Sequence, residues 1–215
     1  MTEENLNHIV YSASVIEFAT IANEYCNFIE NNQSFSREQF FDKLQKLLPL
    51  LYYKVSLLPE VDDEDVDTPE KVVTEVDYNF LLNRLSSKLG AFDSYLEVFD
   101  PGMQFSESPV EASIAENLCD IYQDLKDFIF AYRMGTTEIM TDALWECRNN
   151  FREYWGQKLV NGLRAIHSHI FSENDLNGED DHVSSRDISD HKGSNWVSKH
   201  FNNYSDEEDF LNNDL

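Results

Sequence analysis

Apolar residues recur at three- and four-residue spacing along most of the first 171 residues, as expected for amphipathic helices. Within residues 3–30 this stripe consists of Val15, Phe18, Ala22, Tyr25 and Ile29. The spacing predicts a first long helix with these side chains in the core.

A second helix is predicted to begin near Arg37. Ser36 can act as its N-cap, and Gln39 stands at the third helical position, where it completes a capping box. Pro49 lies inside the apolar continuation of this helix, so we expect a kink or a break there. Pro59 is expected to end the helix.

The next segment, residues 60–67, holds six acidic side chains and is predicted to be a loop. Thr74 and Asp77 then resemble a helix start, and Gly90 suits the position just past a helix end. These signals predict a third helix. Residues 91–107, which are rich in aromatic side chains, are expected to pack over a pair of helices.

A fourth helix is predicted to start at Ser108, because Ser108-Pro-Val-Glu111 combines an N-cap, a proline at the first helical position and a reciprocal glutamate. It should run to about Met134 and stop at Gly135. Thr136 or Thr137 then caps a fifth helix that continues to about residue 171. Five helices with short connections predict an all-α, antiparallel bundle.

The composition changes at Ser172. The 44 residues from there to the end contain 12 acidic and 3 basic side chains. Their few apolar side chains bury too little surface to form a core. We therefore expect a helical domain over residues 1–171 and an acidic, disordered tail over residues 172–215. A few large side chains in the tail form a candidate partner-binding motif: Trp196, Val197, Phe201, Tyr204, Phe210 and Leu211.

The chain is strongly acidic, with a formal net charge of -25 from 16 basic and 41 acidic residues. This charge argues against direct binding to nucleic acids or to anionic membranes. It allows association with a basic partner protein. The alternative is that the acidic residues only keep the protein soluble. No signal peptide or apolar span is evident, so we expect a cytoplasmic protein. The three cysteines are expected to be small core residues: Cys26, Cys119 and Cys147.

One candidate metal site lies on the predicted fourth helix. At 100° per residue, four carboxylates fall on one stripe: Glu116, Asp120, Asp124 and Asp127. Hard cations such as Mg²⁺ or Mn²⁺ prefer such ligands, as in helical nucleotide pyrophosphatases and di-iron bundles. The partner motifs, Glu-x-x-Glu or Glu-x-x-His on another helix, are missing. We therefore favour the alternative that the stripe is the solvated face of an amphipathic helix, with no metal cofactor.

Arg148 is a second candidate. It projects near the middle of the apolar face of the predicted fifth helix, beside Trp155 and with Arg152 at the flank. A guanidinium cannot lose its charge there, so it must find acceptors. Asp100, Asp124 and Asp127 are the candidates. We expect a buried pair that clamps a loop onto the bundle, and a binding site for an anion is the alternative.

Four segments of the chain resemble a family of uncharacterised bacterial proteins found in Bacteroidetes, domain of unknown function 5063. They are Leu96-Glu-Val-Phe-Asp-Pro101, Asp120-Ile-Tyr-Gln-Asp-Leu-Lys-Asp127, Ala143-Leu-Trp-Glu-Cys-Arg148 and Tyr154-Trp-Gly-Gln-Lys-Leu-Val-Asn-Gly-Leu-Arg-Ala-Ile-His167. The resemblance covers the helical body but not the tail. It implies no activity, cofactor or catalytic residue.

Two classes of function remain after these arguments. The first, which we favour, is a non-enzymatic interaction or adaptor protein of the bacterial cytoplasm, since the chain is acidic and shows no assembled catalytic motif. The alternative is a hydrolase that depends on a divalent metal, of the nucleotide pyrophosphatase type, using the carboxylates of the fourth helix.

Overall fold

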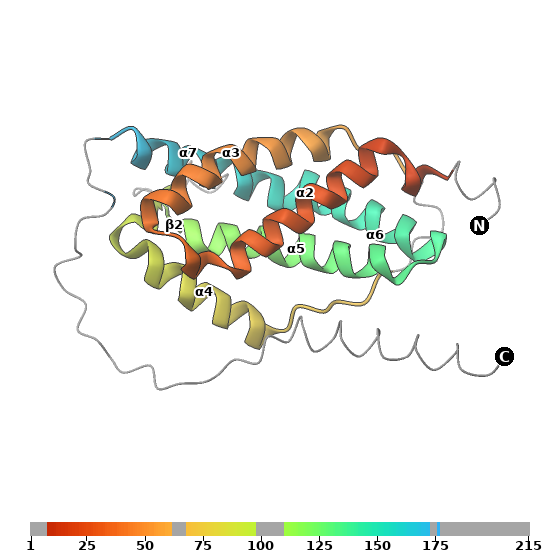
Figure 1. The fold of residues 1–215 in the computed structure, drawn as a ribbon, viewed down its shortest axis with the longest axis horizontal. Coiled ribbons are helices and arrows are strands. Elements are labelled where there is room, and N and C mark those ends of the chain that lie inside the picture. Colours follow the sequence, from red (N-terminus) through yellow and green to blue (C-terminus); the bar gives the residue numbers. More distant parts are fainter. Residues whose placement is uncertain (1–7, 62–67, 98–109, 173–175, 177–215) are drawn as a thin grey trace. The chain divides into compact units, whose positions relative to one another are not determined.

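The structure is a computed structural model that describes residues 8–61, 68–97, 110–172 and 176. Its helices are α2 (Ala13–Glu30), α3 (Arg37–Ser56), α4 (Glu75–Leu89), α5 (Ile114–Met134), α6 (Thr137–Asn150) and α7 (Gly156–Ile170), with a π-helix, η5 (Phe151–Trp155), joining the last two. Short 3-10 turns, η1 (Ile9–Tyr11), η2 (Asn32–Ser34) and η3 (Gly90–Phe92), complete the helical part. The prediction of an all-α bundle is confirmed (Figure 1).

Two helix starts follow the sequence signals directly. The Ser36 hydroxyl accepts a hydrogen bond from the backbone N–H of Gln39, whose side chain accepts one from the N–H of Ser36. Thr74 and Asp77 make the same reciprocal pair at the start of α4. Helix α3 runs through Pro49 without interruption, so the expectation of a break there is wrong.

The predicted start of the fourth helix is wrong. Ser108 lies outside the described residues, and Glu111 is part of a strand, β2 (Glu111–Ser113), instead of a first helical turn. This strand pairs antiparallel with β1 (Ser94–Leu96) in a small two-stranded sheet.

The true start of α5 uses a second copy of the same signal. Ser113 accepts a hydrogen bond from the N–H of Glu116, so Ser-x-x-Glu recurs five residues later. The carboxylate of Asp93 reinforces this end of the helix, because it accepts from the Ser113 hydroxyl and, at 2.7 Å, from the N–H of Ala115. A negatively charged side chain near a helix N-terminus is favourable. Because Asp93 lies beside Ser113, it favours Ser113 over Ser108 as the start of α5.

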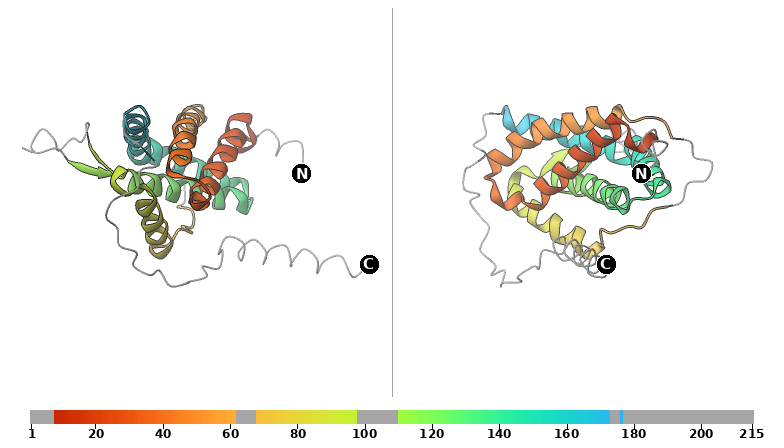
Figure 2. Two further views of the ribbon diagram at one scale, coloured as in Figure 1. Left: turned by 60° about the vertical axis from the view of Figure 1, so that its left-hand side comes forward. Right: turned by 45° about the vertical axis from the view of Figure 1, so that its right-hand side comes forward.

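Helix α5 is the centre of the bundle. It packs against α2, α4, α6 and α7, and Figures 1 and 2 show it lying among them. Its buried residues therefore lie on more than one side, including polar Asn117 and Asp127. Gly135 ends the helix with a φ of 93°, a conformation that glycine adopts without steric cost.

The predicted fifth helix is one helical run with an irregular middle. Residues 137–170 pass from α6 through η5 into α7, and the N–H of Gly156 donates to the carbonyl of Phe151 five residues earlier. This wide turn accommodates one more residue than an α-helical turn. The five predicted helices are thus all present, the last of them with this insertion.

The expected core is largely confirmed. The predicted stripe of α2 is fully buried, and the three cysteines are buried and free of disulfides. Within the described ranges no helix is long and apolar enough to cross a membrane. The predicted disordered tail falls outside the described residues, apart from Ser172 and Leu176, as does most of the predicted acidic loop of residues 60–67.

Candidate functional site

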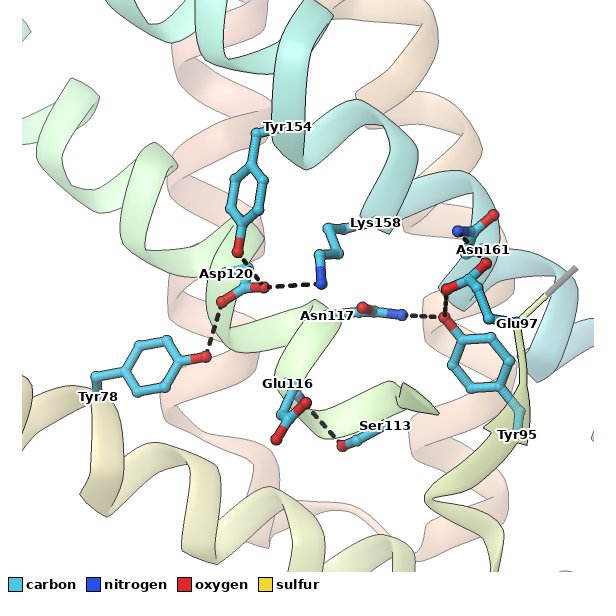
Figure 3. A network of polar contacts seen from close by, with 10 residues as sticks. All are labelled: Tyr78, Tyr95, Glu97, Ser113, Glu116, Asn117, Asp120, Tyr154, Lys158 and Asn161. Carbon is cyan, nitrogen blue, oxygen red and sulfur yellow. Dashed lines mark hydrogen bonds and ion pairs between the residues drawn. The ribbon is translucent and has the colours of Figure 1, made fainter. Parts of the chain in front are cut away.

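Asp120 of α5 is the centre of a polar network (Figure 3). Its two carboxylate oxygens accept hydrogen bonds of 2.7 Å, one from the Tyr78 hydroxyl and one from the Tyr154 hydroxyl. The ammonium of Lys158 lies 3.5 Å from the same oxygen that Tyr154 uses. Hydrogen bonds to a charged acceptor are about twice as strong as neutral ones. Asp120 therefore stabilises the contacts of α5 with the elements that carry these three side chains.

Tyr78 is distant in the chain from the other two partners, which lie four residues apart. Tyr78 belongs to the first turn of α4, Tyr154 to the π-helix and Lys158 to the first turn of α7. The Lys158 ammonium also lies 5.5 Å from the centre of the Tyr154 ring. The π-helix and the first turn of α7 thus present a tyrosine and a lysine to the same carboxylate.

A second cluster lies beside the first, one turn earlier on α5. Asn117 donates to the hydroxyl of Tyr95 at 2.6 Å, and that hydroxyl donates to Glu97 at 3.3 Å. The other oxygen of Glu97 accepts a hydrogen bond from Asn161 of α7. Both asparagine side chains are buried, so their amide groups need these partners. The cluster fastens the end of β1 to α5 and α7.

The tyrosines of the network act as hydrogen-bond donors. Burial, and then the neighbouring Asp120 carboxylate, raises the pKa of both Tyr78 and Tyr154 above the ordinary value. Burial also raises the pKa of Tyr95 to about 12. All three hydroxyls therefore keep their protons at neutral pH, which suits a fixed scaffold better than acid–base chemistry.

A separate acidic pocket lies between α5 and α6. It encloses a cavity of about 10 Å³, the space of a single water molecule, and is lined by Pro69, Lys71, Asp124, Asp127, Phe128, Ala143, Glu146, Cys147 and Asn150. The ammonium of Lys71 lies 2.8 Å from Glu146 and 3.9 Å from Asp127. This single cation of the pocket thus pairs with two of the three carboxylates that line it.

Asp127 holds the chain that leads into α4. One of its oxygens accepts hydrogen bonds from the backbone N–H groups of Val72 (2.9 Å) and Val73 (3.2 Å). Asp124, one turn earlier, accepts a hydrogen bond of 2.6 Å from the side chain of Asn150. Burial raises the pKa of Asp124 to about 6, and it also raises the pKa of Asp127, although the backbone donors oppose this shift.

We expect Asp124→Asn to stabilise the protein at neutral pH. Folding raises the pKa of this carboxyl from 3.8 to about 6, so its contribution to stability is present below pH 4 and is lost as the pH rises through 6. A difference of about two pKa units corresponds to ~3 kcal/mol, and partial solvation lowers this. We expect a gain of about 1–2 kcal/mol at pH 7.5.

Urea unfolding of both proteins at pH 5 and pH 7.5 measures this effect. The gain should shrink at pH 5, where the carboxyl is mostly protonated. Asp127, whose pKa burial also raises, and His169, whose pKa burial lowers, are present in both proteins. The difference in stability between the two proteins therefore reports the contribution of Asp124 alone. Equal stability of the two proteins at pH 7.5 would contradict the prediction.

The interpretation of the carboxylate stripe as a solvated face is wrong for most of its length. Glu116 is exposed, but Asp127 is 5% exposed, and the side chains of Asp120 and Asp124 are largely covered. The reason is that α5 is surrounded by other helices, so its polar side faces α4, α6 and α7. The stripe does not converge on one point either, and the described residues contain no group of three or more potential ligands that could hold a metal ion.

Arg148 pairs with a residue that was not among its expected partners. Its guanidinium lies 3.2 Å from Glu60, a residue whose side chain is 89% exposed, whereas Asp124 and Asp127 bind other groups. Asp100 lies outside the described residues. The Arg148 side chain is 22% exposed, so the pair is a partly solvated ion pair worth less than about 1 kcal/mol.

The other two residues of the predicted arginine site, Arg152 and Trp155, lie in different environments. Arg152 is exposed. Trp155 is fully buried, where its indole N–H donates to the carbonyl of Cys147 at 3.1 Å. Projection at 100° per residue fails here because the π-helix changes the phase of the face between Arg148 and Trp155.

Sequence reasoning missed the partners of Asp120 and the whole Glu97 cluster. Hydroxyl and amide side chains have no periodic pattern, and their partners are distant in the chain. One signal was present: the segments that carry the family resemblance contain Glu97, Asp120, Tyr154, Lys158 and Asn161. Those five residues lie together in the polar network (Figure 3).

Comparisons with known proteins agree with the helical body. Residues 9–172 match a family described as Domain of unknown function (DUF5063). A crystal structure of a protein from Bacteroides fragilis, determined by the Northeast Structural Genomics Consortium, is similar with a TM-score of 0.70 and 42% sequence identity. The similarity covers 78% of this chain and 98% of that chain. No curated protein is significantly similar to this chain in sequence.

Proposed function

The chain belongs to the DUF5063 family, and we propose that it is a non-enzymatic interaction protein of the cytoplasm, which binds a basic partner protein through the outer face of α3. The family match brings no activity with it. The proposal rests on the surface of the helical body and on the contacts of its carboxylates.

The observation that carries the proposal is a row of exposed apolar side chains on α3. Leu50, Tyr53 and Leu57 are 39%, 56% and 46% exposed, and their spacing places them on one face of the helix. Ile16 of α2 is also exposed, and the ion pair between Glu17 and Lys54 brings that part of α2 close to α3. Contiguous exposed apolar residues of this kind are typical of protein-binding surfaces.

The charge of the chain favours a basic partner. A net charge of -25 attracts basic proteins at long range and repels nucleic acid and acidic proteins. A partner segment with apolar side chains and flanking lysines or arginines fits the α3 face best. Its apolar groups would cover Leu50 and Tyr53, while its cations would be attracted by the net negative charge of the whole chain.

The contacts of the carboxylates favour this function over the metal-dependent hydrolase. Asp120 is bound by two tyrosines and a lysine, Asp127 by two backbone N–H groups, and Asp124 by an asparagine. A metal ion would have to displace these internal donors. We therefore propose a function that needs no Mg²⁺ or Mn²⁺.

Affinity capture with matched variants tests the proposal. The double variant Leu50→Ser and Tyr53→Ser should lose a basic protein that the native chain retains from its own cytoplasm, and binding should weaken as salt is raised. Val160→Ser is the matched control, since Val160 is similarly exposed on α7. Equal recovery by the native chain and the double variant would overturn the assignment to α3, and recovery of no basic protein would overturn the function.

A further inference from the structure

Helix α3 contains a proline on its exposed side. Proline is the least favourable residue inside a helix, because it has no N–H and its ring collides with the carbonyl four residues earlier. The helix nevertheless continues through Pro49, since buried residues hold both of its halves in the core, namely Leu44, Leu48, Leu51 and Val55. Pro49 itself is exposed, so core packing does not account for a proline at this position.

The missing N–H leaves the carbonyl of Gln45 without its regular donor. In an α-helix this oxygen accepts a hydrogen bond from the N–H of the residue four positions later, which here is Pro49. The oxygen points along the helix towards Pro49, so it lies beside an exposed ring. Gln45 therefore presents a backbone acceptor at the outer surface of α3.

Two exposed tyrosine rings flank this acceptor. At 100° per residue, Gln45 and Pro49 fall between Tyr52 on one side and Tyr53 on the other. These two tyrosines are 42% and 56% exposed. The Lys54 ammonium lies 5.7 Å from the centre of the Tyr53 ring, so this surface already holds a cation against an aromatic face. An acceptor oxygen between such rings suits a planar cation.

Two lysines of α3 near this acceptor bind carboxylates instead of the carbonyl. The Lys46 ammonium lies 2.8 Å from each oxygen of Asp42, and the Lys54 ammonium lies 2.7 Å from Glu17. Each of these positive charges therefore has a counter-charge beside it. The net charge of -25 over the whole chain then attracts a further cation, which a partner protein would bring.

We propose that an arginine side chain of the partner is the anchor on α3, where it donates to the carbonyl of Gln45 and stacks against the flanking tyrosine rings. A guanidinium is planar, carries five donors and is less strongly hydrated than an ammonium. It therefore uses the acceptor and the rings at the same time. This inference rests on the proposed binding of a basic protein to the α3 face, and it names the side chain that is recognised there.

Two synthetic helical peptides test the anchor with the full chain. Both carry leucines on one face and lysines on the other, and they differ only in having arginine or norleucine at one central position. The arginine peptide should bind the native chain about ten-fold more tightly, as measured by fluorescence anisotropy. Pro49→Leu restores the N–H and keeps an apolar side chain, so it should remove most of this difference and raise the melting temperature by a few degrees. Ser56→Ala, an exposed change on the same side of α3, should keep the difference.

Weaker binding and higher stability are expected in the same variant, so partial unfolding cannot imitate the result. Equal affinity of the two peptides for the native chain, or an undiminished preference for arginine in Pro49→Leu, would overturn the anchor. Binding of neither peptide would also overturn it, whereas the proposed function is decided separately by the capture of a basic protein.

A measurement on the native chain replaces the variant if Pro49→Leu does not fold. The carbonyl ¹³C resonance of Gln45, followed by NMR, should shift more with the arginine peptide than with the norleucine peptide. Equal shifts with the two peptides would exclude the hydrogen bond to Gln45.

Discussion

Replacing Gly156 with alanine is expected to lower the free energy of unfolding by about 3 kcal/mol. A Cβ atom at this position would overlap the carbonyl oxygen of Phe151 and would lie 2.9 Å from two carbons of its ring. The oxygen belongs to the backbone of the π-helix and accepts the hydrogen bond from Gly156 itself. The alanine side chain therefore fits only if the wide turn rearranges.

Gly162 provides the matched control, because it lies in the same helix and is also buried. A Cβ atom there would have its nearest neighbour, the Cβ of Asn117, at 3.7 Å, an ordinary contact distance. Since alanine is the better helix former, Gly162→Ala should raise stability by up to about 1 kcal/mol. Urea unfolding of both variants should give shifts of opposite sign, and a neutral Gly156→Ala would show that the π-helix is not needed.

Asp120→Ala is expected to cost about 3 kcal/mol. The change removes the shared acceptor of Tyr78 and Tyr154 and the counter-charge of Lys158. Hydrogen bonds to a charged group are each worth about 1.5–3 kcal/mol. Tyr154 is 47% exposed and can turn to water, so most of the loss should come from Tyr78.

Glu116→Gln is the control for this prediction, because Glu116 is an exposed carboxylate on the same helix and should change stability by less than about 0.5 kcal/mol. A double-mutant cycle between Asp120→Ala and Tyr78→Phe separates the shared hydrogen bond from general effects. Additive losses in this cycle would show that the two side chains do not interact.

The helical architecture could be predicted from the sequence because its signals are local. Ser36, Thr74 and Thr136 each cap a helix by accepting a hydrogen bond from the backbone N–H three residues on. The start of α5 could not be predicted in the same way, since Ser108 and Ser113 offer the same signal. The carboxylate of Asp93, which lies far away in sequence, reinforces the second of them.

The candidate site was largely beyond sequence reasoning. The acidic stripe of α5 has the sequence pattern of a solvated face. Most of it is buried only because other helices pack against it. Asp120 was identified as a residue of interest, but its partners Tyr78 and Tyr154 could not be found, because a hydroxyl donor requires no regular spacing. For Arg148, the sequence predicted a buried pair, whereas the side chain is 22% exposed and its ion pair is with Glu60.

The polar network depends on the number of residues in the wide turn at residues 151–155. Removing any one residue there would allow a regular α-helix through the segment, but it would rotate everything that follows by about 100° and shift it by about 1.5 Å. Lys158 would then no longer face Asp120, and Asn161 would no longer face Glu97, although every contacting residue would still be present. Among relatives of this chain, the number of residues between Cys147 and Lys158 is therefore as informative about the site as the residues that form it.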